Sequence, residues 1–230
     1  MRKGFTLIEV LVVVAVIALL LSILMPSMAA ARAQARLAVC SSNLRGMALA
    51  VRMYAQESQD WLPTAEPPMR EFPDSRHWFM NASLLKRMDT PLRTTSDGEL
   101  LGPPATGTIM ICPAHEESAR WRNGTELTYG LSYGMNGTWG LGGRPDHYDQ
   151  RRMTEFTRES EVMVFMDAWG EEAAPGIVLY RMCPKDNIQF RHRGRTNVAF
   201  LDGHISTYTQ EQVPFGMENR YLHFWSSRKP

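Results

Sequence analysis

The first feature of the chain is a long apolar run close to its N-terminus. Every position in 10–25 is apolar except Ser22. The wider segment 5–25 contains 21 residues, and as a helix it would reach roughly 31 Å at about 1.5 Å per residue. Because the hydrocarbon core of a bilayer has about this thickness, the pattern predicts a helix that is able to cross a membrane.

A second apolar pattern begins beyond Pro26, where hydrophobic positions recur every three or four residues. The stripe consists of Leu37, Cys40, Leu44, Met47, Val51, Tyr54, Ser58 and Trp61. Such spacing gathers side chains on one face of a helix, and Pro26 is expected to bend that helix. Packing on a sheet is favoured over a coiled-coil dimer, because the stripe spans fewer than four heptads and includes Cys and Ser.

The rest of the chain is predicted to form loops followed by strands. The stretch 63–104 is rich in proline, and a short helix is expected around 78–88. Four later runs of β-branched or aromatic residues, bounded by Gly, Pro or Asp, have the pattern of strands. These runs are 162–166, 177–182, 196–201 and 204–209. A helix first and strands last predicts an α+β fold in which a long N-terminal helix packs on a C-terminal antiparallel sheet.

The charge and the cysteine content argue against nucleic-acid binding and against a recognisable zinc motif. Lys and Arg total 25 against 24 Asp and Glu, which gives a formal net charge of +1. Because nucleic-acid binding relies on a surplus of basic residues, we expect no nucleic-acid partner. The three cysteines, Cys40, Cys112 and Cys183, have no recognised zinc spacing and permit at most one disulfide.

One charged residue lies at the start of the apolar segment. Glu9 is unfavourable in lipid unless it has a partner. Cleavage between Gly4 and Phe5 would supply one, because the new amine on Phe5 would lie one helical turn before Glu9. The alternative is a cleaved secretory signal with its cleavage site in alanines 29–31, but the apolar run is longer than such signals usually have.

Residues 3–11, KGFTLIEVL in one-letter code, closely resemble the processing and methylation signal of type IV pilins and type II secretion pseudopilins. The resemblance implies cleavage after Gly4 by an inner-membrane prepilin peptidase and N-methylation of Phe5. It also implies that Glu9 docks onto the Phe5 amine of a neighbouring subunit during assembly.

The same resemblance implies a division of the chain. Residues 1–4 would be the leader peptide, 5–28 the transmembrane and assembly helix, and 29–230 a pilin-like globular domain that includes the amphipathic half of the helix. The protein is then expected to be a single-pass protein of the inner membrane, with this domain in the periplasm or at the cell surface.

The last two predicted strands are joined by Asp202-Gly203. This pair favours a two-residue type I′ turn, because both central positions need positive φ. Such a turn would place Phe200 opposite Ile205 on the face of the hairpin that is expected to meet the core.

The segment from His192 through nine residues to Asp202-Gly203 is similar to the His-x9-Asp-Gly signature of a large group of prepilin-like proteins. Further motifs of that group lie at 40–45 (CSSNLR), Tyr54, 112–113 (CP), 132–136 (SYGMN) and the strand ending in Asp167. This second resemblance supports the pilin-like architecture and leaves the biochemical task open.

Four residues near the C-terminal strands could have either a chemical or a structural role. His192, Asp202 and His204 could bind a metal or act as acid and base, but a structural hairpin is favoured because the turn already explains Asp202. Asp167 could help to bind Ca²⁺ with loop carbonyls, as some pseudopilins do, but a capping or turn aspartate is favoured. The sequence therefore predicts no metal, no cofactor and no enzymatic activity.

Cys40 lies on the apolar helix face, and Cys112 ends a short apolar run. A bridge between them would attach the loop-rich stretch to the helix, which is reasonable in an oxidising compartment. Two buried free thiols are the alternative, and Cys183 is left without a partner in either case.

Two functions remain. The first is a pseudopilin-like structural subunit of a type II secretion or type IV pilus-like assembly, whose partners are the prepilin peptidase, other pilin-like subunits and the lipid bilayer. The second is a membrane-tethered or secreted periplasmic enzyme or binding module that uses its N-terminus only as a signal. Gly4 and Glu9 favour the first.

Overall fold

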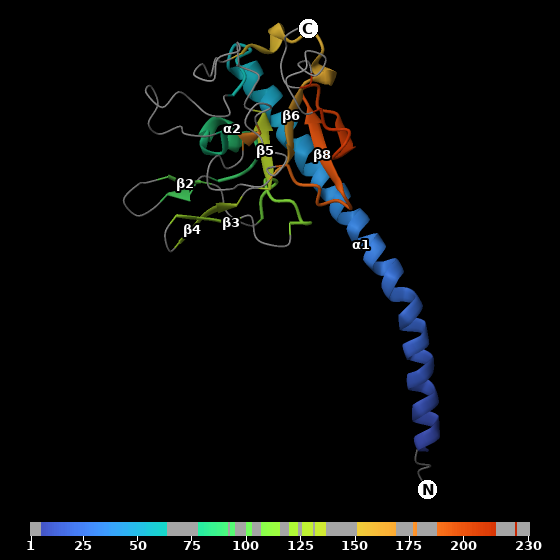
Figure 1. The fold of residues 1–230 in the computed structure, drawn as a ribbon. Coiled ribbons are helices and arrows are strands. Elements are labelled where there is room, and N and C mark those ends of the chain that lie inside the picture. The colour runs from blue at the N-terminus through green and yellow to red at the C-terminus, as the bar shows by residue number, and fades with distance from the viewer. Residues whose placement is uncertain are drawn as a thin grey trace.

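The computed structural model shows a long helix that extends from a globular head (Figure 1). It describes residues 6–63, 78–91, 93–94, 100–102, 107–115, 120–123, 126–130, 132–136, 151–168, 177–178, 188–214 and 224. Gly4, Phe5, Cys183 and the loop 137–143 lie outside the described residues.

The long helix is α1, Leu7–Glu57, and it continues without a break through Pro26. Thr6 is its N-cap, and at its C-terminal end the N–H of Ser58 donates to the carbonyls of Tyr54 and Ala55. Pro26 therefore does not interrupt the helix. Figure 1 shows that the helix axis curves between the half that extends away from the head and the half that packs against it.

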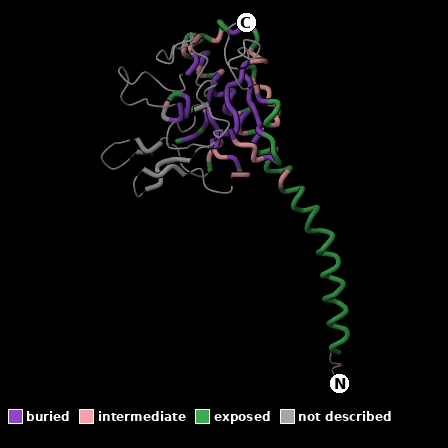
Figure 2. Tube along the Cα trace, in the orientation of Figure 1, coloured by how far each residue is buried: buried purple, intermediate pink, exposed green. Residues whose placement is uncertain are grey.

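The first half of α1 is exposed along its whole length, as Figure 2 shows. Its large apolar side chains, from Leu7 to Met28, contact no other part of the described chain closely enough to be buried. The helix is long and apolar enough to cross a membrane, by a criterion that a signal sequence near an N-terminus also meets.

The second half of α1 enters the head. Its buried residues are Cys40, Leu44, Met47, Ala48, Ala50, Val51 and Ala55. These residues include the central members of the predicted stripe, so the stripe packs on the protein's own core. Burial of each large aliphatic side chain contributes about 1.5–3 kcal/mol. Cys40 is the first buried residue of the helix in chain order and marks its point of entry.

A five-stranded sheet packs against this half of α1 in the order β7-β5-β6-β8-β9. Its strands are β5 Tyr133–Asn136, β6 Met163–Asp167, β7 Ile177–Val178, β8 Arg195–Phe200 and β9 Ile205–Thr209. Four of them are antiparallel, and β7 pairs with β5 in parallel. The α+β arrangement predicted from the sequence is thus confirmed, with one parallel edge strand added.

Smaller elements surround this framework. They are the 3-10 helices Trp78–Met80, Met153–Glu155 and Glu159–Glu161, the helix α2 Ala82–Arg87, the hairpin of β1 Arg93–Thr94 with β2 Leu100–Gly102, and the hairpin of β3 Arg120–Asn123 with β4 Glu126–Gly130. The first of these 3-10 helices and α2 lie where the sequence predicts a short helix.

The sheet is buried on both faces. One apolar cluster lies between α1 and the sheet and includes Trp78, Met135 and Phe165. A second cluster covers the opposite face and includes Val198 and Phe200 from β8. Consequently every residue of β8 except its first is buried.

The turn between β8 and β9 differs from the sequence prediction. Ala199, not Phe200, pairs with Ile205. The N–H of Gly203 donates to the Phe200 carbonyl at 2.9 Å, and Gly203 alone in this loop has positive φ, at 93°. The loop is therefore one residue longer than a type I′ turn, with a glycine in the left-handed region at its end.

The reason for the longer loop is the burial of Leu201. Its side chain belongs to the cluster under α1, and its N–H donates to the Val162 carbonyl at 2.9 Å. Asp202 Oδ1 accepts the His204 N–H at 3.0 Å, which stabilises the turn without positive φ at Asp202. A one-residue change of register reverses the faces of a strand, so the core under α1 receives Ala199 and Ile205.

This loop predicts an order of mutational effects. Gly203→Val should lower the free energy of unfolding by about 1–3 kcal/mol, because a β-branched residue is strained at positive φ. Steric contact adds little, since an added Cβ would meet only Leu49 Cδ2, at 3.8 Å. Asp202→Asn should have a smaller effect, because its Oδ1 can still accept the His204 N–H. Denaturant titration of the full chain in detergent micelles measures both, and equal stability of Gly203→Val and wild type would contradict the loop geometry.

Candidate functional site

The first candidate site is the start of α1. The Glu9 carboxylate accepts hydrogen bonds through Oε2 from the Thr6 N–H at 2.8 Å and from the Thr6 hydroxyl at 2.9 Å. In return, Thr6 Oγ1 accepts the Glu9 N–H at 3.4 Å. This reciprocal arrangement is a capping box, which satisfies backbone donors that a helix start leaves unpaired.

The capping box adds a local partner for Glu9 that the sequence analysis did not identify. It holds the carboxylate at the N-terminal end of α1, where the helix dipole favours a negative charge. The signal for it was the pair Thr6 and Glu9 at a spacing of three. Phe5, the residue proposed to carry the amine, directly precedes Thr6 and lies outside the described residues.

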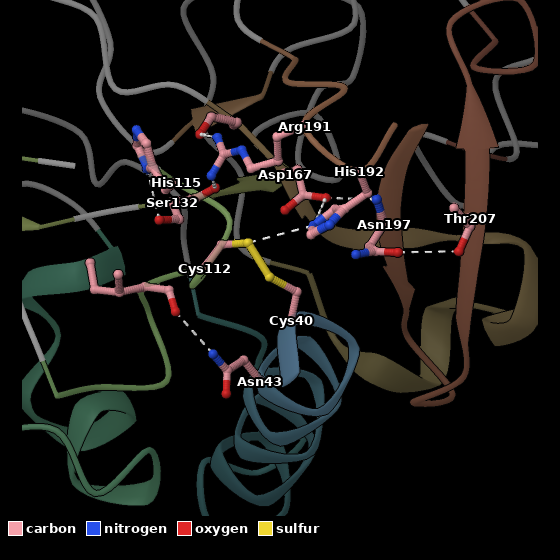
Figure 3. A network of polar contacts seen from close by, with 12 residues as sticks. Cys40, Asn43, Cys112, His115, Ser132, Asp167, Arg191, His192, Asn197 and Thr207 are labelled. Carbon is pink, nitrogen blue, oxygen red and sulfur yellow. Dashed lines mark hydrogen bonds and ion pairs between the residues drawn. A yellow bond between two sulfur atoms is a disulfide. The ribbon is translucent and has the colours of Figure 1, made fainter. Parts of the chain in front are cut away.

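The second candidate site is a buried polar cluster around Asp167, at the end of β6 (Figure 3). The Asp167 side chain is fully buried. Its Oδ2 accepts the N–H of Asn197 at 2.8 Å, whereas Oδ1 has no hydrogen-bond partner among the described residues. His192 Nε2 lies 3.5 Å from Oδ2, which is ion-pair range if the ring is protonated.

Strand order explains how Asp167 and His192 meet. β6 and β8 are antiparallel neighbours, so the end of β6 lies beside the start of β8. A tight turn precedes β8, with positive φ at Arg193 and Gly194. The N–H of His192 donates to the Arg195 carbonyl at 3.1 Å across this turn, which directs the ring toward Asp167.

A disulfide between Cys40 and Cys112 borders the cluster, with the Cα atoms 5.2 Å apart. It joins α1 to the segment 107–115, across 72 positions of sequence. A second link lies one helical turn further along, where Asn43 Nδ2 donates to the Ile111 carbonyl at 3.0 Å. Cys112 Sγ lies 3.5 Å from His192 Nε2, so the bridge and the Asp167 cluster form one continuous network.

Arg191 connects the cluster to the backbone. Its guanidinium donates to the carbonyl of Ser132 at 3.2 Å and to that of Ala168 at 2.8 Å. Burial lowers the pKa of Arg191, while the nearby Asp167 carboxylate acts in the opposite direction. Burial, and then Asp167, raises the pKa of the Tyr133 hydroxyl, which keeps that group neutral.

A histidine and serine pair lies beside Arg191. His115 Nδ1 is 2.9 Å from Ser132 Oγ. Burial, and to a smaller extent Arg191, lowers the pKa of His115 from 6.5 to about 4. A ring with that pKa is a weak base at neutral pH, and the Ser132 side chain is buried. The pair is therefore poorly suited to nucleophilic catalysis and well suited to linking 107–115 to the sheet.

The candidate residues of the C-terminal element do not form one site. His192 belongs to the buried cluster, whereas Asp202 and His204 face each other at the exposed hairpin tip, with Oδ1 and Nδ1 2.7 Å apart. Burial alone would raise the pKa of Asp202, but hydrogen bonds from the backbone and ring of His204 together lower it. Around Asp167, an imidazole and a disulfide replace the oxygen-rich shell that Ca²⁺ prefers.

Sequence reasoning singled out Asp167 and His192 separately and missed that they meet. The available signal was the position of each at a strand end, but using it required knowledge that the strands of 162–166 and 196–201 are neighbours. The contributions of Arg191, His115 and Asn197 carried no recognisable spacing and were also missed.

Comparison with known proteins supports the N-terminal signal. Residues 1–25 match a family model described as the prokaryotic N-terminal methylation motif. No curated protein and no solved structure matches the chain. The chain therefore carries a prepilin-type processing signal followed by a helix that fits membrane anchoring, while the similarity of its His-x9-Asp-Gly element stays a prediction.

The disulfide yields a test of connectivity and stability. In protein recovered from membranes without reduction, peptide mapping should find Cys40 joined to Cys112, with Cys183 open to alkylation. The double variant Cys40→Ala/Cys112→Ala should lose roughly 4 kcal/mol of unfolding free energy, because a long loop is no longer closed in the unfolded chain. Alkylation of Cys40 and Cys112 before reduction would contradict the bridge.

His115 predicts a dependence of stability on pH. Between about pH 6.5 and 4 the unfolded chain binds a proton on His115 that the folded chain does not, so stability should fall as the pH is lowered through this window. His115→Asn can retain a hydrogen bond to Ser132 without a titrating ring. Its melting temperature should therefore depend less on pH in this range than that of wild type, and an unchanged dependence would contradict the burial of a neutral ring.

Proposed function

We propose that this protein is a pseudopilin-like structural subunit of a type II secretion or type IV pilus-like assembly. It is cleaved after Gly4 by a prepilin peptidase, N-methylated on Phe5 and anchored in the inner membrane by the first half of α1. Its head then lies in the periplasm or at the cell surface. The proposal rests on the methylation motif at 1–25. This motif overlaps the first half of α1, which is apolar and exposed, and the second half of the same helix packs into the head.

The exposed half of α1 supports an assembly role. Its apolar side chains face outward on all sides, which suits lipid before assembly and neighbouring helices after it. Because α1 is continuous through the region between its two halves, a contact made by the free half is transmitted to the head through a single element. A signal that is cut off after export has no need of such continuity.

Glu9 supplies the specific contact. In the single chain its carboxylate binds Thr6, and this arrangement keeps the charge at the membrane depth of the processed N-terminus. A neighbour's Phe5 amine offers a full positive charge in place of neutral donors, and charge-assisted hydrogen bonds are the stronger kind. We therefore infer that, during assembly, the Glu9 carboxylate binds the neighbour's Phe5 amine, either in place of Thr6 or in addition to it.

The head supports a structural role outside the cytoplasm. The disulfide between Cys40 and Cys112 is typical of an oxidising compartment. The pair of His115 and Ser132, with its weak base and buried hydroxyl, is consistent with a structural role for this part of the head.

The test compares three variants in membranes of the native host, with a photo-cross-linker at Val13 in the exposed half of α1. Glu9→Ala and Glu9→Gln should enter the membrane as well as wild type, because each removes a charge from lipid. Both should lose cross-links to other pilin-like subunits, because neither can pair with the Phe5 amine.

Thr6→Ala is the matched control. It removes the hydroxyl of the capping box, at a cost of about 1 kcal/mol to the helix start, but keeps the Glu9 charge. It should therefore retain most cross-links. Cross-linking of Glu9→Ala at the wild-type level would refute the pairing, and equal losses in Thr6→Ala and Glu9→Ala would show that Glu9 acts only as a helix cap.

A further inference from the structure

Four metal-ligating side chains converge at the point where α1 enters the head. They are Cys40 from α1, Cys112 from the segment 107–115, Asp167 from β6 and His192 from the turn before β8, and all four are buried. The two sulfur atoms and His192 Nε2 lie within 4.8 Å of one another. Asp167 Oδ2 lies 3.5 Å from the same nitrogen.

From this arrangement we propose that the reduced chain binds one zinc ion between Cys40, Cys112, His192 and Asp167. Two thiolates, one imidazole and one carboxylate are a ligand set that Zn²⁺ accepts in tetrahedral geometry. In the oxidised chain the two sulfurs are bonded to each other and offer no thiolate, so the site exists only after the disulfide has opened. Figure 3 shows the imidazole and the carboxylate on the same side of the bridge.

Two of the distances are close to those of a zinc tetrahedron. With Zn–S near 2.3 Å and Zn–N near 2.0 Å, a tetrahedral site has an S···N edge of about 3.5 Å and an N···O edge of about 3.3 Å. The corresponding distances here are 3.5 Å from Cys112 Sγ to His192 Nε2 and 3.5 Å from His192 Nε2 to Asp167 Oδ2. The edge between Cys112 Sγ and His192 Nε2 is therefore present before any metal enters, and the second distance places the Asp167 carboxylate beside the same nitrogen.

The two sulfurs have to separate, and an Asp167 oxygen has to approach them, because the ligand atoms that lie within 4.8 Å of one another belong to Cys40, Cys112 and His192 and not to Asp167. A tetrahedral site needs the two sulfurs about 3.8 Å apart, which is farther than two bonded sulfurs can be. The Cβ atoms of a bridged pair already lie about 3.8 Å apart. Rotation that brings the two Cβ–Sγ bonds parallel thus gives the required separation without moving the backbone.

A second observation is the unpaired oxygen of Asp167. Its Oδ1 is buried and has no hydrogen-bond partner among the described residues, although buried carboxylate oxygens nearly always have one. The N–H of Asn197 fixes the other oxygen at 2.8 Å and so orients the group. The Arg191 guanidinium, which interacts electrostatically with Asp167, balances the single negative charge of a complex between Zn²⁺ and three anionic ligands.

The chemistry involves two balanced steps. A thiol or phosphine reductant gives two electrons to the disulfide, and two protons complete two thiols while the reductant is oxidised. Zn²⁺ then displaces both thiol protons and binds two thiolates, neutral His192 and ionised Asp167, with no change in its own oxidation state. Reoxidation by a small-molecule disulfide reverses the order: this oxidant takes two electrons and is reduced to two thiols, the bond between Cys40 and Cys112 re-forms, and the ion is released because both thiolates are consumed. The metal would cross-link the same two segments that the disulfide joins.

The test uses the full chain in detergent micelles with Cys183→Ser as the background, so that two thiols remain. One sample stays oxidised and one is reduced with a phosphine, which competes less for zinc than a dithiol does. Both receive ZnCl₂, pass through gel filtration and are analysed for metal. We expect about one zinc ion per reduced chain and none per oxidised chain, and cobalt in place of zinc should give a sulfur-to-cobalt charge-transfer band.

His192→Gln and His204→Gln form a matched pair. Each removes a ring that lies beside an aspartate, but only His192 lies in the cluster. The first should weaken zinc binding at least about tenfold, and the second should leave it unchanged. In the reduced background chain, zinc should also protect Cys40 and Cys112 from alkylation until a chelator is added.

Circular dichroism separates loss of the site from loss of the fold. A reduced chain that keeps its oxidised-state spectrum and binds no zinc would overturn the proposal. So would zinc that remains bound with unchanged affinity in His192→Gln or in Cys40→Ser. A reduced chain that unfolds and is not restored by zinc would also overturn it, whereas zinc-dependent refolding with protected thiols would support it.

Discussion

The structure depends on the contact between the second half of α1 and the five-stranded sheet. The larger apolar cluster joins the two, with Leu44 and Met47 from α1 and Phe165 from β6, and the sheet has no other long helix over this face in the described residues. Arg52 reinforces it at the hairpin, where its guanidinium donates to the Leu201 carbonyl at 2.9 Å and to Glu159 Oε2 at 2.5 Å. The disulfide fastens the opposite end, at the first buried residue of the helix.

This contact lets one helix serve two environments. Up to residue 32 the described part of α1 is exposed, and from Cys40 onward one face of it is buried. In the proposed assembly, the free half would exchange lipid for neighbouring helices without disturbing the head, because the buried residues of α1 begin at Cys40. The proposed structural role needs this separation, because the anchor would change surroundings during assembly while the domain has to stay folded.

The spacing of apolar residues correctly predicted the elements whose conformation depends on local sequence. The helix, its buried face and the strands from 163 to 209 follow from apolar spacing, because the side chains that meet there lie at regular intervals. The strand β5 was missed, since Gly134 and Asn136 are weak strand formers and pairing with β6 decides its conformation. The hairpin register was wrong, because the burial of Leu201 under α1, a tertiary contact, overrode the local preference of Asp202-Gly203.

The buried cluster shows the same limit at the level of the site. Each of Cys40, Cys112, Asp167 and His192 was recognisable from the sequence, but their meeting depends on β6 and β8 being neighbours although β7 lies between them in the chain. The processing signal, by contrast, is a local motif, so it could be recognised from the sequence alone.

We propose that the N-terminus is a processed end, and the assembly contact depends on the amine that this processing creates. The measurement that tests it most directly is the N-terminal sequence and intact mass of the mature protein isolated from membranes of its native host. We expect a chain that begins at Phe5 with one added methyl group on its amine. A chain that begins near Arg32, after the alanines at 29–31, would contradict it, as would a chain that keeps residues 1–4.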